Sequence, residues 1–331
     1  MGYVIMWHML DYAQAGRSHC KNNIPCQDKT VSCRMNGVHL LGLADGAGSA
    51  KFSHFGAETA LQATCDYTAN NFESIFNQTD GVQVKKNILA RILEALRQKA
   101  EQLNCNIKDL ASTLLFVAIK NNKFLLFHIG DGVIGYWKND SLKVASKPET
   151  GEFSNTTVFT TSSKALLYMK LFKGNIENIH GFVLMSDGAA ESFYQKRTGQ
   201  LAPVIVRIMR KVCLVEHGEM LQLLKDSFQL VVNNTQDDCS IAIIAQYNEE
   251  LERFLSMNFW QQMRYFNINN KRRAKKKYSL WMKIIKYLNE PKTVQQIAQC
   301  VCLKKKYLRK QLFLMAKMQL VKKMNNKFHL R

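Results

Sequence analysis

The chain has 331 residues, of which 47% are hydrophobic, and its 46 Lys and Arg outnumber 26 Asp and Glu to give a net charge of +20. This length exceeds what one hydrophobic core usually holds, so one large domain and a smaller one are expected. No apolar run approaches the ~18 residues that span a bilayer, and the nine cysteines follow no regular spacing. A membrane protein and a disulfide-rich secreted protein are therefore excluded, and we expect reduced thiols in the cytoplasm.

The basic charge is concentrated near the end of the sequence. Residues 271–331 hold 19 of the Lys and Arg but one acidic residue, Glu290, and so carry +18 of the net +20. Such a segregated field predicts an anionic partner, which could be nucleic acid, an acidic protein surface or an anionic membrane. Of these, a membrane is not expected, because no apolar run spans a bilayer and the first residues match no lipidation motif.

Runs with strand character recur through the first three quarters of the chain, and some flank the Asn-Gly or Asn-Asn pairs that close tight hairpins. These runs are residues 3–11, 30–34, 38–44, 113–120, 124–129, 132–137, 142–146, 181–187 and 239–246. The hairpin around Asn36-Gly37 would carry Asp28 and Asp45 at neighbouring strand ends.

Apolar residues recur at helical spacing in segments between these strands. The segments are residues 55–76, 82–103, 203–215 and 218–232. Strands first, helix pairs between and strands again predict an α+β fold, with antiparallel sheets packed on each other and helices outside. Residues 146–180 show no clear pattern.

Four acidic positions lie at the ends of apolar, strand-like runs. Asp45, Asp131 and Asp187 each follow such a run, and Asp237 comes just before one. Mg²⁺ and Mn²⁺ prefer oxygen ligands and need several of them, so these positions predict a cluster that binds hard cations. Asp-Gly is also the commonest two-residue hairpin turn, and only Asp131, which a strand-like run follows directly, fits that alternative well.

These motifs resemble, in order and spacing, those of the metal-dependent type 2C serine/threonine protein phosphatases. The similar segments are PCQD at 25–28, DGAG at 45–48, IGDG at 129–132, LMSDGAAES at 184–192 and DDCSIAII at 237–244. The resemblance covers residues 1–247 and implies a central β-sandwich flanked by helical layers, with the metals at one end. It also implies hydrolysis of phosphoserine and phosphothreonine by a metal-activated water, with two or three Mn²⁺ or Mg²⁺ ions as cofactor.

The resemblance implies a role for each matching residue. Asp45 would bridge two ions, the Gly46 carbonyl would coordinate one of them, and Asp187 and Asp237 would hold the other. Asp28 would act in or beside the first coordination shell. Asp45 and Asp28 are thereby predicted to be catalytic.

Two further positions match the family less closely. Asp131 corresponds to a residue that joins an additional, weaker metal in some relatives, with the hairpin turn as the alternative. The family's phosphate-gripping arginine lies close to the opening acidic motif, whereas Arg17 lies eleven residues before Asp28. Arg17 is the candidate for that role, with Arg34 and Lys51 as alternatives.

No histidine occupies the position from which some relatives protonate the leaving alkoxide. Ala47 follows the first Asp-Gly instead. His54 and His19 are the nearest candidates in sequence, and His54 is the predicted acid, although a structural role explains either residue as well. The metal-binding motifs therefore match the family better than the substrate-facing groups do.

A helical and basic linker is predicted at residues 248–277, followed by a compact unit at 278–331. Its predicted elements are helices at 279–288, 293–301 and 304–318 and strands at 320–324 and 327–331. Three helices followed by a hairpin resemble a winged helix-turn-helix domain, whose third helix enters a DNA groove. The candidate nucleic-acid-binding residues on that helix are Lys304, Lys305, Lys306, Arg309 and Lys310.

Two functions remain open. The first is an active phosphatase whose protein substrate is phosphorylated by a partner kinase, with the basic module binding nucleic acid or a partner. The alternative is a DNA-tethered regulatory protein with a catalytically weak or inactive phosphatase-like domain. A two-metal nuclease could use the same carboxylates, but the motif order favours the phosphatase.

Overall fold

The computed structural model describes residues 7–139, 141–149, 157–233, 235–247, 253–254, 257, 261–262, 271–288, 292–324 and 326–330. The chain divides into a larger unit, His8–Ala245, and a smaller unit made of Met1–Trp7 and Gln246–Arg331. In the described part of the chain, no helix combines the length and apolar character needed to cross a membrane.

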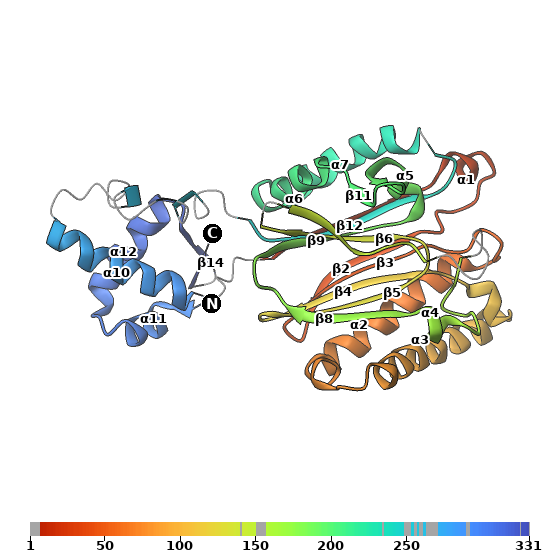
Figure 1. Ribbon diagram of the computed structural model, residues 1–331, viewed down its shortest axis with the longest axis horizontal. Coiled ribbons are helices and arrows are strands. Elements are labelled where there is room, and N and C mark those ends of the chain that lie inside the picture. The colour runs from red at the N-terminus through yellow and green to blue at the C-terminus, as the bar shows by residue number, and fades with distance from the viewer. Residues whose placement is uncertain are drawn as a thin grey trace. The chain divides into compact units, whose positions relative to one another are not determined.

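Two five-stranded antiparallel sheets form the larger unit (Figure 1). In spatial order, the first contains β1 (His8–Gln14), β12 (Cys239–Ala245), β9 (Ile179–Met185), β6 (Val133–Lys138) and β7 (Ser141–Ser146). The second contains β2 (Lys29–Met35), β3 (Val38–Ala44), β4 (Leu114–Lys120), β5 (Lys123–Ile129) and β8 (Lys170–Asn175).

The central strands of the second sheet are buried on both faces. Leu40 and Phe116 belong to a hydrophobic cluster shared with helices α2 (Ser53–Asn77) and α3 (Gly81–Leu103). Their neighbours Leu41 and Val117 are also fully buried. Because successive side chains of a strand point to opposite faces, these neighbours fill the space between the two sheets.

Helices cover the outer face of each sheet, as Figure 1 shows. The α2–α3 pair covers the second sheet, and α6 (Val204–Leu214) and α7 (His217–Val232) cover the first. Asp80 caps α3, since its side chain accepts from the backbone N–H groups of Val82 and Gln83. The predicted β-sandwich flanked by helical layers is confirmed.

The predicted hairpins form at the expected turns. Asn36 and Gly37 have φ values of 50° and 77°, the left-handed conformation that a tight β2–β3 turn requires. In the resulting register Lys29 lies opposite Ala44. Asp28 and Asp45 therefore lie at neighbouring strand ends, as predicted.

Asp131 does not close a hairpin. The strands on either side of it, β5 and β6, belong to different sheets, and β6 pairs with β7 and β9 instead. The interpretation of Asp131 as a hairpin turn is therefore wrong, because the chain crosses between the sheets at this point.

Several elements differ from the sequence prediction. The first strand begins at His8 and ends at Gln14 rather than at residue 11, and the predicted residues 3–6 lie outside the described part. The segment without a clear pattern contains α4 (Ala165–Tyr168) and the edge strand β8. Short elements not predicted as such are α1 (Arg17–Lys21), η1 (Ile107–Leu110), α5 (Asp187–Phe193), β10 (Tyr194–Gln195) and β11 (Gln200–Leu201).

The described elements of the smaller unit are three helices and a three-stranded antiparallel sheet ordered β13-β15-β14. In chain order they are α10 (Lys271–Tyr287), β13 (Lys292–Thr293), α11 (Val294–Cys300), α12 (Lys305–Lys317), β14 (Val321–Met324) and β15 (Lys327–Leu330). Trp281, Leu308 and Leu312 are fully buried in one cluster. A capping box of Thr293 and Gln296 opens α11.

Helix α10 begins within the segment predicted as a linker. Residues 271–277 are helical, because Lys, Arg and Ala are good helix formers and no Gly or Pro interrupts them before the amphipathic part of the helix. Most of the connecting helix expected before residue 271 lies outside the described residues.

Candidate active site

Three aspartates from separate elements meet at one end of the sandwich. Asp45 follows β3, Asp131 lies between β5 and β6, and Asp187 begins α5. One carboxylate oxygen from each residue lies within 4.8 Å of the others, a spacing that could hold a metal ion. The expectation that strand ends bring these acids together is confirmed for these three.

Asp28 and Asp237 border this group. Asp28 is 1% exposed, and its Oδ2 accepts a 2.6 Å hydrogen bond from Ser240 Oγ. Asp237 is exposed, and its charge raises the pKa values of Asp45 and Asp187. The structure therefore brings all five predicted acidic residues into one electrostatic neighbourhood.

Burial, and to a smaller extent the charges of neighbouring carboxylates, disfavours ionisation of the carboxyl groups. Burial raises the pKa of Asp45 well above its ordinary range, and the charges of Asp28, Asp187, Asp237 and Asp131 raise it further. Burial, with smaller charge effects, raises the pKa of Asp28 to about 7 and that of Asp187 to about 6. Such a set of oxygen donors fits divalent cations, which would stabilise the ionised forms.

An unsatisfied buried atom supports the same fit. Oδ1 of Asp28 has no hydrogen-bond partner among the residues that the structure describes. A buried carboxylate oxygen without a donor is unfavourable unless a cation or an ordered water completes its surroundings. The residues present therefore fit a divalent metal site.

The backbone around Asp45 is held on both sides. Its N–H donates to Thr113 Oγ1 at 2.9 Å, and its carbonyl accepts from the N–H of Thr113 at 2.8 Å. At the next residue, Gly46, a Cβ would lie 2.8 Å from Ser53 Cβ and 2.9 Å from the Gln27 carbonyl oxygen. Only glycine therefore fits where the chain leaves β3.

A family model for protein phosphatase 2C matches residues 15–229, about two thirds of the chain. The chain belongs to the protein phosphatase 2C family. It is 26% identical over 190 residues to serine/threonine-protein phosphatase 3 of Escherichia coli (strain K12). The matched region covers 55% of this chain and 73% of that protein. The protein is a serine/threonine phosphatase, and its cofactor is Mn²⁺ or Mg²⁺.

Solved structures share the fold of this phosphatase. Stp1 from Staphylococcus aureus, a serine/threonine phosphatase, superimposes with a TM-score of 0.51 at 16% identity, over 75% of this chain and 98% of Stp1. PppA of Pseudomonas aeruginosa, described as a regulatory component of T6SS, has a TM-score of 0.51 at 15% identity, over 74% of this chain and all of PppA.

Arg17, the candidate phosphate anchor, lies beside the loop that carries Asp237. It is exposed on α1, and its Nε donates a 3.0 Å hydrogen bond to the carbonyl of Thr235. Arg34 pairs with His39 at the opposite end of the β2–β3 hairpin, roughly 20 Å along the strand from Asp28. Lys51 lies over the ring of Phe52 at 5.1 Å.

The two candidate histidines have different surroundings. The centroid of the His54 ring lies 4.2 Å from that of Phe55, with the two rings tilted at 38°, and burial and the charge of Lys29 lower the pKa of His54. His19 Nδ1 lies 2.8 Å from Oδ1 of Asp238, the residue after Asp237. The structure thus ties His19, rather than His54, to an acidic loop of the site, and the catalytic role of His54 stays a prediction.

The sequence interpretation missed supporting residues. Thr113 holds Asp45, Ser240 bonds to Asp28, and Asp238 bonds to His19. Ser240 and Asp238 lie within the DDCS motif itself, so their position was a usable signal. Thr113 precedes an apolar strand and carries no comparable mark in the sequence.

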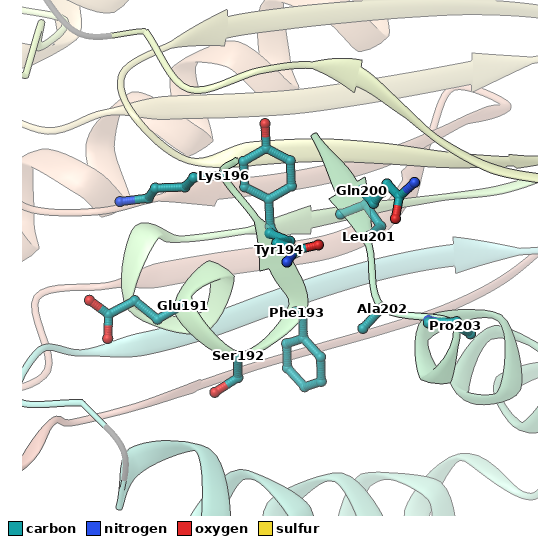
Figure 2. Close-up of a pocket in the computed structure, with 10 residues that line it drawn as sticks. Glu191, Ser192, Phe193, Tyr194, Lys196, Gln200, Leu201, Ala202 and Pro203 are labelled. Carbon is teal, nitrogen blue, oxygen red and sulfur yellow. The ribbon is translucent and has the colours of Figure 1, made fainter. Parts of the chain in front are cut away.

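A surface cavity of about 630 Å³ lies at the end of α5, away from its first residue (Figure 2). Tyr194 and Lys196 extend from one side of the chain there, while Phe193 points the other way, where its ring lies 6.4 Å from that of Phe228. None of its lining residues belongs to the acidic cluster. The cavity is therefore distinct from the metal site.

Proposed function

We propose that the phosphatase hydrolyses phosphoserine and phosphothreonine in protein substrates at the acidic cluster. The residues that would hold the metals are Asp28, Asp45, the carbonyl of Gly46, Asp131, Asp187 and Asp237. When bound, divalent cations supply a water of lowered pKa and neutralise charge on the phosphoryl oxygens. The convergence of Asp45, Asp131 and Asp187 within 4.8 Å carries this proposal.

The chain's own groups bind and orient the substrate. Arg17 binds the phosphate dianion, because guanidinium groups match phosphate oxygens well. A hydrogen bond to the Thr235 carbonyl holds its guanidinium next to the Asp237 loop. Asp28 and Asp45 orient the attacking water from adjacent strand ends. Protonation of the leaving alkoxide falls to His54 or His19, which substitutions of the two residues would distinguish.

Hydrolysis of a phosphopeptide by the full chain, with Mn²⁺ and with a chelator, tests this function. Asp45→Asn and Asp187→Asn should each lower kcat/KM by more than the ~100-fold that loss of an outer-shell partner produces. Asp226→Asn, an exposed aspartate on α7, removes the same charge elsewhere and should leave activity unchanged. Chelator-resistant hydrolysis, or full activity in both site variants, would contradict the proposal.

We also propose that the smaller unit is a winged helix-turn-helix module that binds DNA. Its element order and its sheet order β13-β15-β14 support this fold. The residues that would contact phosphates are exposed and precede or begin α12: Lys304, Lys305, Lys306, Arg309 and Lys310. Lys323 and Lys327 are exposed on the β14–β15 hairpin and would add contacts from the wing.

Titration of a labelled DNA duplex with the full chain at several salt concentrations tests this module. The logarithm of the binding constant should fall with log salt by about 0.9 per phosphate contacted. Lys306→Glu with Lys310→Glu should weaken binding and reduce that slope, whereas Lys99→Glu on α3 should not. Binding that is absent at low salt would instead favour a protein partner.

The combination of DNA binding with little phosphatase turnover would favour the alternative function, a DNA-tethered regulatory protein. An active enzyme implies a partner kinase that phosphorylates the same substrate. All nine cysteines are free thiols, which supports a reducing compartment such as the cytoplasm.

A further inference from the structure

The carboxylate of Asp238 is buried at the centre of the loops that carry the metal site. Its side chain is 2% exposed. Oδ1 accepts hydrogen bonds from the Gly16 N–H at 2.7 Å and from His19 Nδ1 at 2.8 Å. Oδ2 accepts from the Gln27 N–H at 2.6 Å. One carboxylate therefore binds three donors from the single segment that joins β1 to β2.

Two of the three donors lie next to a residue of the proposed site. Gln27 immediately precedes Asp28, and Gly16 immediately precedes Arg17. On the other side, the N–H of Asp238 donates to Oδ1 of Asp237 at 2.8 Å. The Asp238 side chain thus links the backbone next to Asp28 to the backbone next to Arg17, and the Asp238 N–H binds the side chain of Asp237.

Two glycines pack against the backbone of Asp237 and Asp238. A Cβ on Gly16 would lie 2.2 Å from the carbonyl oxygen of Asp237, and a Cβ on Gly188 would lie 2.2 Å from that of Asp238. Gly188 follows Asp187, so the start of α5 also packs against this peptide. Such close backbone approach leaves the Asp237–Asp238 segment little freedom to move.

We infer that Asp238 is a positioning residue for the metal site. Asp238 holds Asp28, Asp237 and Arg17 in register and does not itself touch metal or substrate. The inference rests on the proposed metal-binding function. Groups that orient metal ligands typically contribute about 10–100-fold to metal affinity or activity. A residue that only stabilised the fold would lower the melting temperature and leave the metal affinity of the folded protein unchanged.

Calorimetric titration of the metal-free full chain with Mn²⁺ tests this role. In Asp238→Asn one oxygen is replaced by an NH₂ group, which must face an N–H donor, either that of Gln27 or those on the Gly16 and His19 side. The Kd for Mn²⁺ should rise about 10–100-fold, with a fall in kcat on a phosphopeptide. Asp226→Asn provides the matched control for loss of one charge and should bind Mn²⁺ as the wild type does.

His19→Ala provides a milder second variant. It removes one of the three donors to the Asp238 carboxylate, and the His19 side chain is 14% exposed. It should raise the Kd for Mn²⁺ by less than Asp238→Asn does, and its effect should not add to that of Asp238→Asn in the double variant.

The outcomes separate the two proposals. Absence of Mn²⁺ binding by the wild type would overturn the metal site itself. Wild-type Mn²⁺ affinity in folded Asp238→Asn would overturn the positioning role alone. If Asp238→Asn does not fold, wild-type affinity in His19→Ala would overturn that role, and a raised Kd would support it.

Discussion

Asp45 and Thr113 are joined by two hydrogen bonds, one from the Asp45 N–H to Thr113 Oγ1 at 2.9 Å and one from the Thr113 N–H to the Asp45 carbonyl at 2.8 Å. The pair links the end of β3 to the residue just before β4, which fixes the direction in which Asp45 leaves the sheet. Thr113 is 1% exposed, so water cannot replace its hydroxyl at low cost.

Thr113→Val should therefore weaken the metal site while it preserves the shape of the side chain. The Asp45 N–H loses its acceptor, which lowers the free energy of unfolding by about 1–3 kcal/mol. The Kd for Mn²⁺ should rise by about tenfold, as for loss of an outer-shell partner. Thr113→Ser keeps the hydroxyl and should retain the wild-type Kd. Equal Mn²⁺ affinity in both variants would contradict the role of this bond.

Gly46→Ala should abolish metal-dependent activity. Its Cβ would lie within 2.9 Å of Ser53 and Gln27, so the chain must shift at the carbonyl proposed to coordinate metal. Gly48→Ala, two residues on, is the matched control, because no atom lies within 4 Å of its added Cβ. Phosphopeptide hydrolysis by the two variants, at saturating Mn²⁺, provides the measurement. A greater loss in Gly48→Ala than in Gly46→Ala would refute this explanation.

Because of the acidic cluster, the metal-free protein should become less stable as pH rises from about 4 to 7. Burial raises the folded-state pKa of Asp28 to about 7 and that of Asp187 to about 6, above the ordinary value of about 3.9. The folded state therefore binds protons more tightly than the unfolded state in this window, and stability falls as those protons leave.

Substitution of one cluster carboxylate isolates this effect from other titrating groups. In EDTA, Asp45→Asn should have a higher melting temperature than the wild type at pH 7.5, and this advantage should shrink towards pH 4.5. Addition of Mn²⁺ should raise the melting temperature of the wild type more than that of the variant. A variant less stable than the wild type at every pH in EDTA would contradict the repulsion inferred here.

Two histidines, the buried His128 and the half-buried His39, should act in the opposite direction. Burial lowers the pKa of His39 to about 4 and that of His128 to about 3. Both stay neutral in the folded state while the unfolded chain protonates them below about 6.5. Stability from these groups is therefore complete above about pH 6.5 and is lost as pH falls towards 4.

His39→Gln should flatten this acid dependence. The free energy of unfolding of the variant minus that of the wild type should increase as pH falls from 7 to 4.5, because the variant lacks one histidine whose pKa is lowered by folding. Urea denaturation at a series of pH values measures the difference, and His217→Gln, at the start of α7, serves as the control. Parallel pH profiles for wild type and His39→Gln would contradict the prediction.

Local patterns were sufficient to predict much of the fold. The Asn36-Gly37 turn predicted both the β2–β3 hairpin and its register, which places Asp28 beside Asp45. Helical periodicity located α2, α3, α6 and α7 within a few residues. The edge strand β8 was not predicted, because an edge strand has one neighbour and an exposed face, and its sequence KLFKGN lacks a buried pattern.

The sequence by itself determined which acids the proposed site would contain and, through short-range turn and periodicity rules, the strands that carry them. Only the tertiary structure decided that Asp131 crosses between sheets to join Asp45, that Arg17 lies beside the Asp237 loop, and that the Asp238 carboxylate is buried among donors. Gly16 and Asp238 are 222 residues apart in the chain. A contact of that kind depends on the packing of two sheets and their loops, so no local pattern of residues marks it in advance.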